Sequence, residues 1–372
     1  MLPTAAFAAG ANGLPFAVCG LDCPFAPVGR LPSSLYTFPV ARAWLGITGL
    51  HRPQSKASPN LAGVPQELPP EEPDLKPSAL PLSYGPLRFA RIFYHMCFSA
   101  IIASMKKLPD YFQLERFNIT PADVIRMAFH CDPDAIRPDV ILMPWWQPTI
   151  FNVWTDRITI NTESILFEME YAGKPVSIVR SGIGAPQTGD VVLALGCTAC
   201  ERIFFAGSVG GLRADFRIGD LLIPEFSVSG DGFCRYLQPG FPTEDRFLER
   251  VLPDEALTLA LSRSAAPLAR EAGVVLHTGP VFSIDTILAQ FGRLDTIVEK
   301  LGCIGIEMET AAVFKAARLV GIQATALLSV SDVPVRNKSL YAGRSEDEKE
   351  NRRQIRKKVL AKILLDTIIQ GV

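Results

Sequence analysis

Residues 303–332 constrain the fold more than any other part of the chain, and they read CIGIEMETAAVFKAARLVGIQATALLSVSD. Small and apolar side chains recur at helical spacing over residues 310–320. Gly321 follows at the position where a left-handed helix cap forms most easily. Residues 324–330 are an apolar run long enough for one buried strand. We therefore expect a strand end, a helix and a buried strand in this order.

Two acids, Glu309 and Asp332, stand at the ends of adjacent elements in this stretch. Open α/β sheets usually place their ligand sites at such ends, so both acids are candidate site residues. A structural role accounts for each acid singly. Glu307 and Glu309 suit the positive end of a helix dipole, and Asp332 suits a turn before Pro334.

From about residue 138 the chain alternates strand patterns with helix patterns. Short apolar runs bounded by Gly, Pro or charged residues predict buried strands at 139–144, 175–180, 202–206 and 220–224. Helical patterns occupy 188–195, 254–272, 294–301 and 345–369. This alternation predicts a single α/β domain with a central, mostly parallel mixed sheet flanked by helices.

Three glycine-containing loops lie within this domain: SGIGAPQT at 181–188, FAGSVGGL at 205–212, and GPVFSIDT at 279–286. Glycines in such loops let backbone N–H groups approach a ligand closely. Together with the E-M-E-T-A helix start and the S-D strand end, these loops resemble those of the nucleoside phosphorylase superfamily. That superfamily includes purine nucleoside and uridine phosphorylases and methylthioadenosine nucleosidases. The resemblance covers about residues 138–370.

The resemblance implies that the protein cleaves the N-glycosidic bond of a nucleoside or a 5'-modified nucleoside. This reaction develops positive charge on the sugar and negative charge on the base. Glu309 is expected to bind the ribose hydroxyls, with Met308 packed against the sugar. Asp332 is expected to donate to the departing base, which requires a raised pKa, and Glu307 to hold the sugar or orient water. The other implied substrate-binding residues are Ser181, Gly182, Gly184, Ser208, Asp285, Thr286 and Ile287.

The residues that hold phosphate in phosphorolytic members are replaced in this chain. Those members carry a G-D-P-x-R loop after the first strand and an Arg before the G-[ST]-x-G turn. Here the loop is MPWWQP at 143–148, and Phe205 stands at the second position. These changes predict a more apolar pocket beside the ribose and favour hydrolysis, because phosphate loses its bidentate guanidinium contacts. Phosphorolysis is the alternative, with phosphate as co-substrate and Arg180, Gly207 and Ser208 as candidate anion-binding residues.

A further alternative is a non-catalytic relative that binds or stores nucleosides. Glu309 and Asp332 together favour an enzyme, because a binding protein has little need for an acid at the leaving group. No cofactor or metal is expected, and the resemblance implies a homo-oligomer, either a dimer or a hexamer. The formal net charge of −1 gives no indication of a nucleic acid or a membrane surface as partner.

The first 85 residues differ in composition from the rest of the chain. They are rich in Pro, Ala and Gly, and Asp22 is their one acid before Glu67. We interpret residues 1–85 as a low-complexity leader, either disordered or an organellar transit peptide. Residues 86–137 are interpreted as a helical extension, in which 87–105 form an amphipathic helix. Residues 138–372 are then the catalytic domain.

The eight cysteines include one pair, Cys197 and Cys200, with metal-like spacing. No second pair and no nearby His accompany them, so we interpret them as packing residues. The cysteines are expected to be reduced thiols of an intracellular, cytoplasmic protein, or of an organellar one if the leader is a transit peptide.

Overall fold

The computed structural model describes residues 108–155, 157–160, 165–243 and 246–371, all within the compact unit Pro81–Val372. The leader and the helix expected at 87–105 lie outside the described residues. The strands are β1 (Asp139–Met143), β2 (Ile158–Ile160), β3 (Leu166–Tyr171), β4 (Lys174–Arg180), β5 (Arg202–Gly211), β6 (Leu221–Gly230), β7 (Arg250–Val251), β8 (Leu276–Ile284), β9 (Gly305–Glu307) and β10 (Gln323–Asp332). The α-helices are α2 (Pro121–Phe129), α3 (Ala185–Leu195), α4 (Glu255–Glu271), α5 (Thr310–Leu319), α6 (Glu346–Ile355) and α7 (Ala361–Gln370).

The described strands form one sheet in the order β10-β6-β8-β9-β5-β1-β4-β3-β2, with β7 beside β6. Strand β10 also pairs with β5, so β5, β10, β6, β8 and β9 make a closed circuit of strands. The strands β4, β1, β5 and β10 run parallel to one another. Their carboxyl ends therefore meet at one edge of the sheet, where α/β proteins usually bind ligands.

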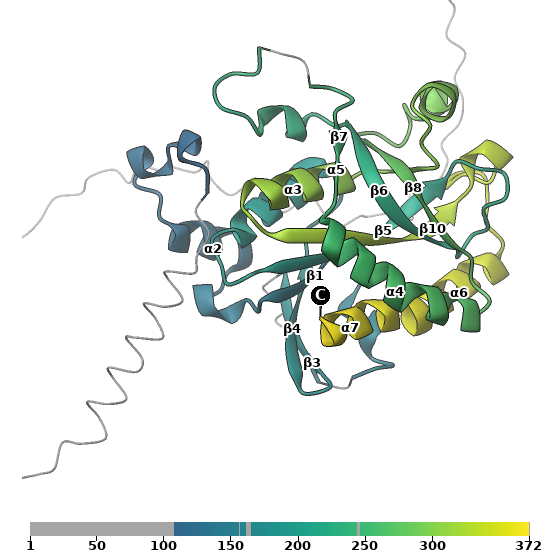
Figure 1. The fold of residues 1–372 in the computed structure, drawn as a ribbon, viewed down its shortest axis with the longest axis horizontal. Coiled ribbons are helices and arrows are strands. Elements are labelled where there is room, and N and C mark those ends of the chain that lie inside the picture. The colour runs from purple at the N-terminus through teal and green to yellow at the C-terminus, as the bar shows by residue number, and fades with distance from the viewer. Residues whose placement is uncertain (1–107, 156, 161–164, 244–245, 372) are drawn as a thin grey trace, which may run out of the picture. The chain divides into compact units, whose positions relative to one another are not determined.

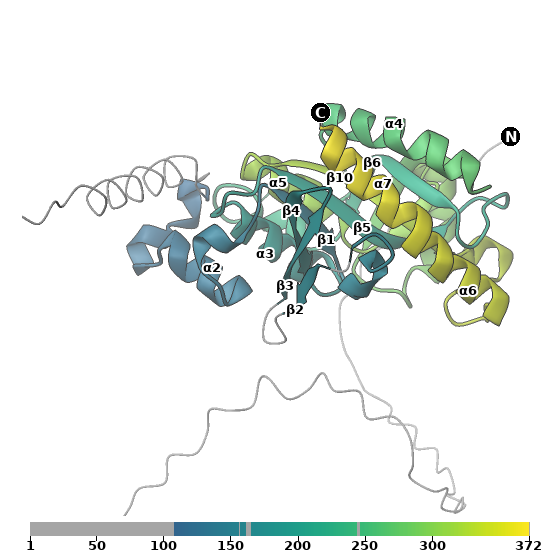
Figure 2. The same cartoon turned by 90° about the horizontal axis from the view of Figure 1, so that it is seen from below.

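Helices cover both faces of the sheet because its strands are apolar on both faces. Along β1, Val140 and Leu142 join the core cluster that includes α3 and α5, whereas Ile141 and Met143 join the one that includes α4 and α7. This alternation follows from the two-residue period of a strand. Figures 1 and 2 show α4 and α7 on one side of the sheet and α3 and α5 on the other. The predicted single α/β domain with a mixed sheet flanked by helices is thus confirmed.

Residues 303–332 form β9, α5 and β10, as their sequence predicts. Gly321 has a φ of +70°, and the next amide, Ile322 N–H, donates to the carbonyl of Ala317 at 2.8 Å. Gly321 therefore ends α5 in the left-handed conformation that favours glycine. Strand β10 is longer than its apolar run, because its pairing with β5 continues to Asp332 opposite Gly210.

Other elements differ from the predicted ones. Residues 294–301 are not a regular α-helix, since a 3-10 turn at Phe291–Arg293 is followed by a π turn at Thr296–Lys300. The C-terminal helical segment consists of α6, a π turn at Arg356–Leu360, and α7. In the N-terminal extension, α2 begins at a capping box formed by Thr120 and Asp123.

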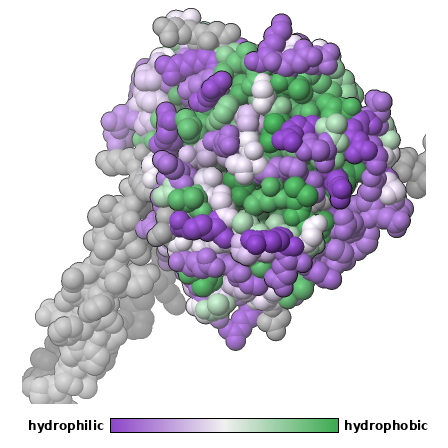
Figure 3. All heavy atoms as spheres, turned by 45° about the vertical axis from the view of Figure 1, so that its right-hand side comes forward, coloured by the Kyte–Doolittle hydropathy of each residue, from purple (hydrophilic) through white to green (hydrophobic). Residues whose placement is uncertain are grey.

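The surface carries hydrophobic side chains in separate patches. On the face shown in Figure 3, these patches are divided by hydrophilic side chains. Within the described part of the chain, no helix combines the length and the apolar character needed to cross a membrane.

Candidate active site

A cavity of about 400 Å³ opens at the carboxyl ends of the parallel strands. Its lining combines three buried carboxyl groups, two arginines and mostly apolar walls. The lining residues are Pro144, Trp145, Ile183, Ser208, Gly210, Ile284, Ile287, Gln290, Ile306, Glu307, Met308, Glu309, Ser331, Asp332, Leu340, Arg344 and Arg352.

Gly210 of β5 lies between the two segments that bring in the acids. It faces Ile306 of β9 on one side and Asp332 of β10 on the other. A Cβ atom at Gly210 would lie 3.1 Å from Cγ2 of Ile306 and 3.6 Å from Oδ1 of Asp332. The absence of a side chain at Gly210 therefore keeps the space between these two strand ends free.

Glu307 ends β9 with both carboxylate oxygens occupied. Its Oε2 accepts hydrogen bonds from the backbone N–H groups of Glu309 and Thr310, each at 2.7 Å. Its Oε1 accepts the hydroxyl of Thr310 at 2.7 Å and the hydroxyl of Ser283. Burial raises the pKa of Glu307, and these hydrogen bonds oppose the rise. Glu307 thus anchors the start of α5.

Glu309 precedes α5, and its side chain is only 5% exposed. Its Oε1 accepts a hydrogen bond of 2.7 Å from the backbone N–H of Gly184, which joins it to the loop before α3. Gly184 has a φ of +97°, a conformation that glycine adopts without strain. Burial, with the nearby charge of Glu307, raises the pKa of Glu309 to about 8.

Asp332 ends β10 and is only 2% exposed. Burial raises its pKa, while the Ser331 hydroxyl, which donates to Oδ1 at 2.6 Å, and the charges of Arg344 and Arg352 oppose the rise. A carboxyl group with a raised pKa at the wall of a cavity is suited to donate a proton.

Two arginines, Arg344 and Arg352, line the cavity although they belong to none of the sequence motifs described above. Nη2 of Arg352 donates to Oγ of Ser208 at 2.6 Å, and Nη1 of Arg344 donates to the carbonyl of Ser331 at 3.2 Å. Helical periodicity is the sequence signal that indicates a buried position for Arg352, because this residue precedes the buried Val359 and Leu360 by seven and eight residues. That spacing places Arg352 on the buried face of the C-terminal helix.

Of the residues expected in the site, the cavity brings together Glu307, Met308, Glu309, Asp332, Ser208 and Ile287. The remaining expected residues do not line it, namely Arg180, Ser181, Gly182, Gly184, Gly207, Asp285 and Thr286. Gly184 still contacts the site through Glu309. The exposed Asp285 accepts the backbone N–H of Gly232 at 2.8 Å, so its carboxylate supports a turn. The buried Gln290 lines the cavity beside Ile284 and Ile287, and the sequence analysis did not name it.

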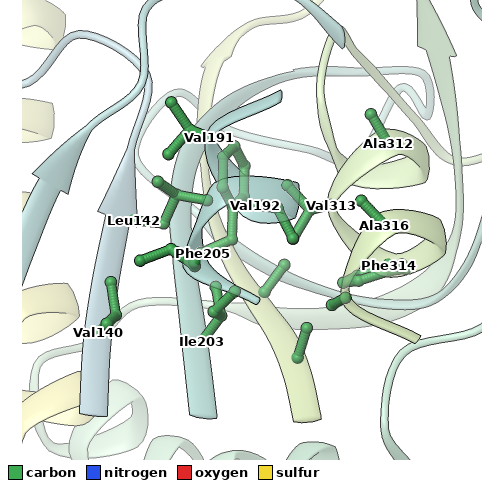
Figure 4. Close-up of a cluster of buried hydrophobic side chains, with 14 of the residues drawn as sticks. Val140, Leu142, Val191, Val192, Ile203, Phe205, Ala312, Val313, Phe314 and Ala316 are labelled. Atoms are coloured by element: carbon green, nitrogen blue, oxygen red, sulfur yellow. The ribbon is translucent and has the colours of Figure 1, made fainter. Parts of the chain in front are cut away.

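Two aromatic residues expected to make the ribose side apolar lie elsewhere. Phe205 is fully buried and points toward Val191 and Val192 of α3 (Figure 4). Trp146 is buried in the core cluster on the other face of the sheet, with the guanidinium of Arg356 5.0 Å from its ring centroid. Of the three aromatic residues Trp145, Trp146 and Phe205, Trp145 is the one that lines the cavity. The expectation was wrong for Phe205 because alternate residues of β5 face opposite sides of the sheet.

A family model described as the phosphorylase superfamily matches residues 158–369. The chain belongs to the phosphorylase superfamily. This confirms the family that the sequence motifs resemble.

Phosphorylases are similar to this chain in sequence. The uridine phosphorylase of Thermococcus kodakarensis is 26% identical over 240 residues, which are 59% of this chain and 82% of the relative. A DeoD-type purine nucleoside phosphorylase of Mannheimia succiniciproducens is 23% identical over 254 residues, 64% of this chain and 96% of the relative.

Solved structures of the superfamily share the fold. A uridine phosphorylase from Vibrio fischeri ES114 matches with a TM-score of 0.52 at 21% identity, over 64% of this chain and 93% of that one. A 5'-methylthioadenosine/S-adenosylhomocysteine nucleosidase from Helicobacter pylori matches with a TM-score of 0.50 at 18% identity, over 64% and 100%. These likenesses show a shared fold.

The thiols and acids of the described residues show no metal-binding arrangement. Among these residues no group of three or more His, Cys, Asp or Glu side chains could hold a metal ion. Cys197 and Cys200 are buried, and burial raises the pKa of Cys197 to about 11. Buried thiols of this kind act as packing residues.

Proposed function

We propose that this protein cleaves the N-glycosidic bond of a nucleoside or a 5'-modified nucleoside and releases the free base. One observation carries the proposal: Glu309 and Asp332, both buried, line a single cavity from two different elements. The arrangement gives the reaction an acceptor for the sugar hydroxyls and a proton donor for the base. Both are required because opposite charges develop on the two halves of the substrate.

The ribose is proposed to bind at Glu309, with Met308 as the wall behind the sugar. The N–H of Gly184 fixes one carboxylate oxygen of Glu309, so the group is held in place before the substrate arrives. A carboxylate accepts hydrogen bonds from two neighbouring hydroxyls, which suits the 2'- and 3'-hydroxyls of ribose.

The base is proposed to leave with a proton from Asp332. Burial raises the pKa of this carboxyl, so it stays protonated at a higher pH than an exposed Asp. When the bond between C1' and the base nitrogen breaks, its electron pair stays on the base, and the proton neutralises the charge. Ile284 and Ile287 with the amide of Gln290 offer an apolar slot with one polar group for the heterocycle.

The nucleophile depends on which group can activate it. Water needs a carboxylate as base, and Glu307, Glu309 and Asp332 are the acids that line the described cavity. Glu307 already accepts four hydrogen bonds, and the other two acids have the sugar and the base as partners. Phosphate is already an anion and needs no such base. The geometry therefore supports phosphorolysis more than the hydrolysis that the missing family arginines favour.

The experiment is base release from a panel of purine and pyrimidine nucleosides, with and without inorganic phosphate, using the full chain. Sugar 1-phosphate as the product supports phosphorolysis, and free ribose formed at a phosphate-independent rate supports hydrolysis. Nucleoside binding without release of any base would refute the proposal and leave a binding protein.

A further inference from the structure

The cavity wall contains two guanidinium groups without a matching anion. Arg344 and Arg352 both line the cavity, and neither has a carboxylate within ion-pair distance among the residues that the structure describes. Arg352 is 6% exposed, and its buried Nε has no hydrogen-bond partner in that part of the chain. The neighbouring Arg356 differs, because its guanidinium lies over the ring of Trp146.

A buried guanidinium without a counter-charge is costly. Removing a charge from water costs several kcal/mol unless an opposite charge or several hydrogen bonds replace the solvent. Burial, with the charges of Arg356 and Arg344, lowers the pKa of Arg352 to about 9. The charge of Asp332 acts in the opposite direction but does not cancel this lowering. A bound oxyanion would relieve this cost.

The fold brings Arg352 close to β5 by a specific packing contact. Helix α6 packs over Gly219, where a Cβ atom would lie 2.8 Å from Cδ1 of Ile355 and 3.8 Å from Cα of Arg352. Gly219 also has a φ of +102°, which other residues rarely adopt. A side chain at this position would push the helix away, so Gly219 lets Arg352 reach Ser208.

We propose that Arg352 and Arg344, together with the hydroxyl of Ser208, form a binding site for a phosphate-class oxyanion beside the sugar. Arginine donors in a planar fork match two oxygens of phosphate at once, and a hydroxyl can bind a third. Arg352 lies in α6 and Arg344 just before it, so the arginines of the site come from the start of the C-terminal helical segment and not from the first-strand loop or residue 205. Arg344, Arg352 and Ser208 therefore perform the function for which Arg180, Gly207 and Ser208 were candidates.

This inference rests on the proposed function and adds the anion to it. In phosphorolysis a phosphate oxygen forms the new bond to C1' while the bond from C1' to the base breaks. The base takes the proton of Asp332, and the proton of hydrogen phosphate restores it, so charge and atoms balance. Phosphate between the arginines and the sugar also shields the developing positive charge from two guanidinium groups.

The test compares the full chain with Arg352→Gln, Arg344→Gln and the control Arg353→Gln. Arg353 lies on the same helix, outside the cavity, and pairs with Glu350. We expect Arg352→Gln to raise the KM for inorganic phosphate roughly 10- to 100-fold, as for loss of a hydrogen bond to a charged group. Arg344→Gln should have a smaller effect in the same direction, Arg353→Gln none, and Arg352→Lys should recover part of the affinity.

A second substrate decides where the oxyanion comes from. The rates of cleavage of a nucleoside 5'-monophosphate and of the nucleoside itself are compared without free phosphate. If the monophosphate is cleaved faster, and this advantage is lost in Arg352→Gln, the oxyanion belongs to the substrate itself. Calorimetric titration with inorganic phosphate needs no turnover. Binding that depends on Arg352 in a chain that cleaves no nucleoside would keep the anion site and refute the proposed function.

The inference is overturned if inorganic phosphate binds with equal affinity to the full chain and to Arg352→Gln, and if neither inorganic phosphate nor a 5'-phosphate on the substrate changes the rate of cleavage. Melting temperatures show whether each variant folds. Should Arg352→Gln fail to fold, Arg344→Gln carries the test, because Arg344 is only half-buried and its removal leaves the core intact.

Discussion

Glu307, Glu309 and Asp332 carry the same functional group at one cavity, and their hydrogen-bond partners give them different tasks. Glu307 accepts four hydrogen bonds and has no capacity left for a substrate. Glu309 accepts the backbone N–H of Gly184 with Oε1 and lines the cavity. Asp332 has a raised pKa at the end of a strand. The number of hydrogen bonds that each carboxyl group accepts therefore separates the structural acid, Glu307, from the two candidate catalytic acids.

We predict that Asp332→Asn lowers kcat far more than it weakens nucleoside binding. The amide keeps the shape of the side chain but cannot deliver a proton, so the loss falls on the transition state, on the order of 100-fold or more. Steady-state kinetics of base release measures it. Ser331→Ala, which removes one hydrogen bond to Asp332 but keeps the acid, is the control and should cost much less. Equal kcat for Asp332→Asn and the unmodified protein would contradict the proton-donor role.

We predict that Glu309→Ala weakens nucleoside binding as well as turnover, because the ribose anchor acts in the ground state and the transition state alike. The ionised carboxylate is the better hydroxyl acceptor, and its pKa is raised to about 8. The ionised fraction grows as pH rises through that value, so the KM for nucleoside should fall between pH 7 and pH 9, a range that brackets this pKa. In Glu309→Ala this pH dependence should disappear, and its persistence would assign it to another group.

At the scale of elements, the start of α5 depends on Glu307. Four donors from β8 and the first turn of α5 converge on one carboxylate, in a place where water cannot replace it. The first N–H groups of a helix have no partner within the helix, so a buried helix start requires such an acceptor. This anchor fixes the direction in which Glu309 leaves the backbone.

We predict that Glu307→Gln destabilises the fold even though Glu307 lines the cavity. The amide nitrogen of Gln is a donor and would face donors, leaving buried polar groups unpaired at a cost of about 1–3 kcal/mol. For a chain of this size the melting temperature should fall by roughly 3–10 °C. Glu348→Gln is the matched control, because Glu348 also caps a helix but is partly exposed at α6. A melting temperature unchanged in Glu307→Gln would contradict the anchoring role.

The C-terminal helical segment shows what an element alone cannot indicate. Its run of charged residues is typical of a solvated helix, and nearly all of these residues are at least partly exposed. Arg352 is the buried exception, since it continues the apolar face of Val359 and Leu360 toward the site. Periodicity marks the position as buried, but the partner of Arg352 comes from β5, far away in the sequence.

At the scale of the whole molecule, the described core lies on both faces of one sheet. Two large core clusters cover the two faces of the sheet, and both consist of residues from 125 onward. We predict that a chain beginning at Pro81 stays soluble and keeps its melting temperature within about 2 °C, because residues 1–80 have no periodic apolar face to bury. Thermal unfolding of the truncated and full chains measures this. A large drop, or loss of solubility, would show that the leader contributes to folding.

The sequence by itself determined the central elements and two of the acids. Strands β1 and β10 and helix α5 follow from local hydrophobic periodicity and from turn residues such as Gly321, and these are properties of a few neighbouring residues. Glu309 and Asp332 were found in the same way, because they stand where those elements end.

Only the tertiary structure decided which side chains meet at the cavity. Ser208 and Arg352 are 144 residues apart in sequence, and Gly184 and Glu309 are 125 apart. Their contacts depend on strand order and on helix packing across the sheet, which no local pattern encodes. The same holds for Phe205, which turns into the core because its place in β5 faces α3. Strand pairing sets which face each residue takes, and a shift of one residue would exchange the two faces.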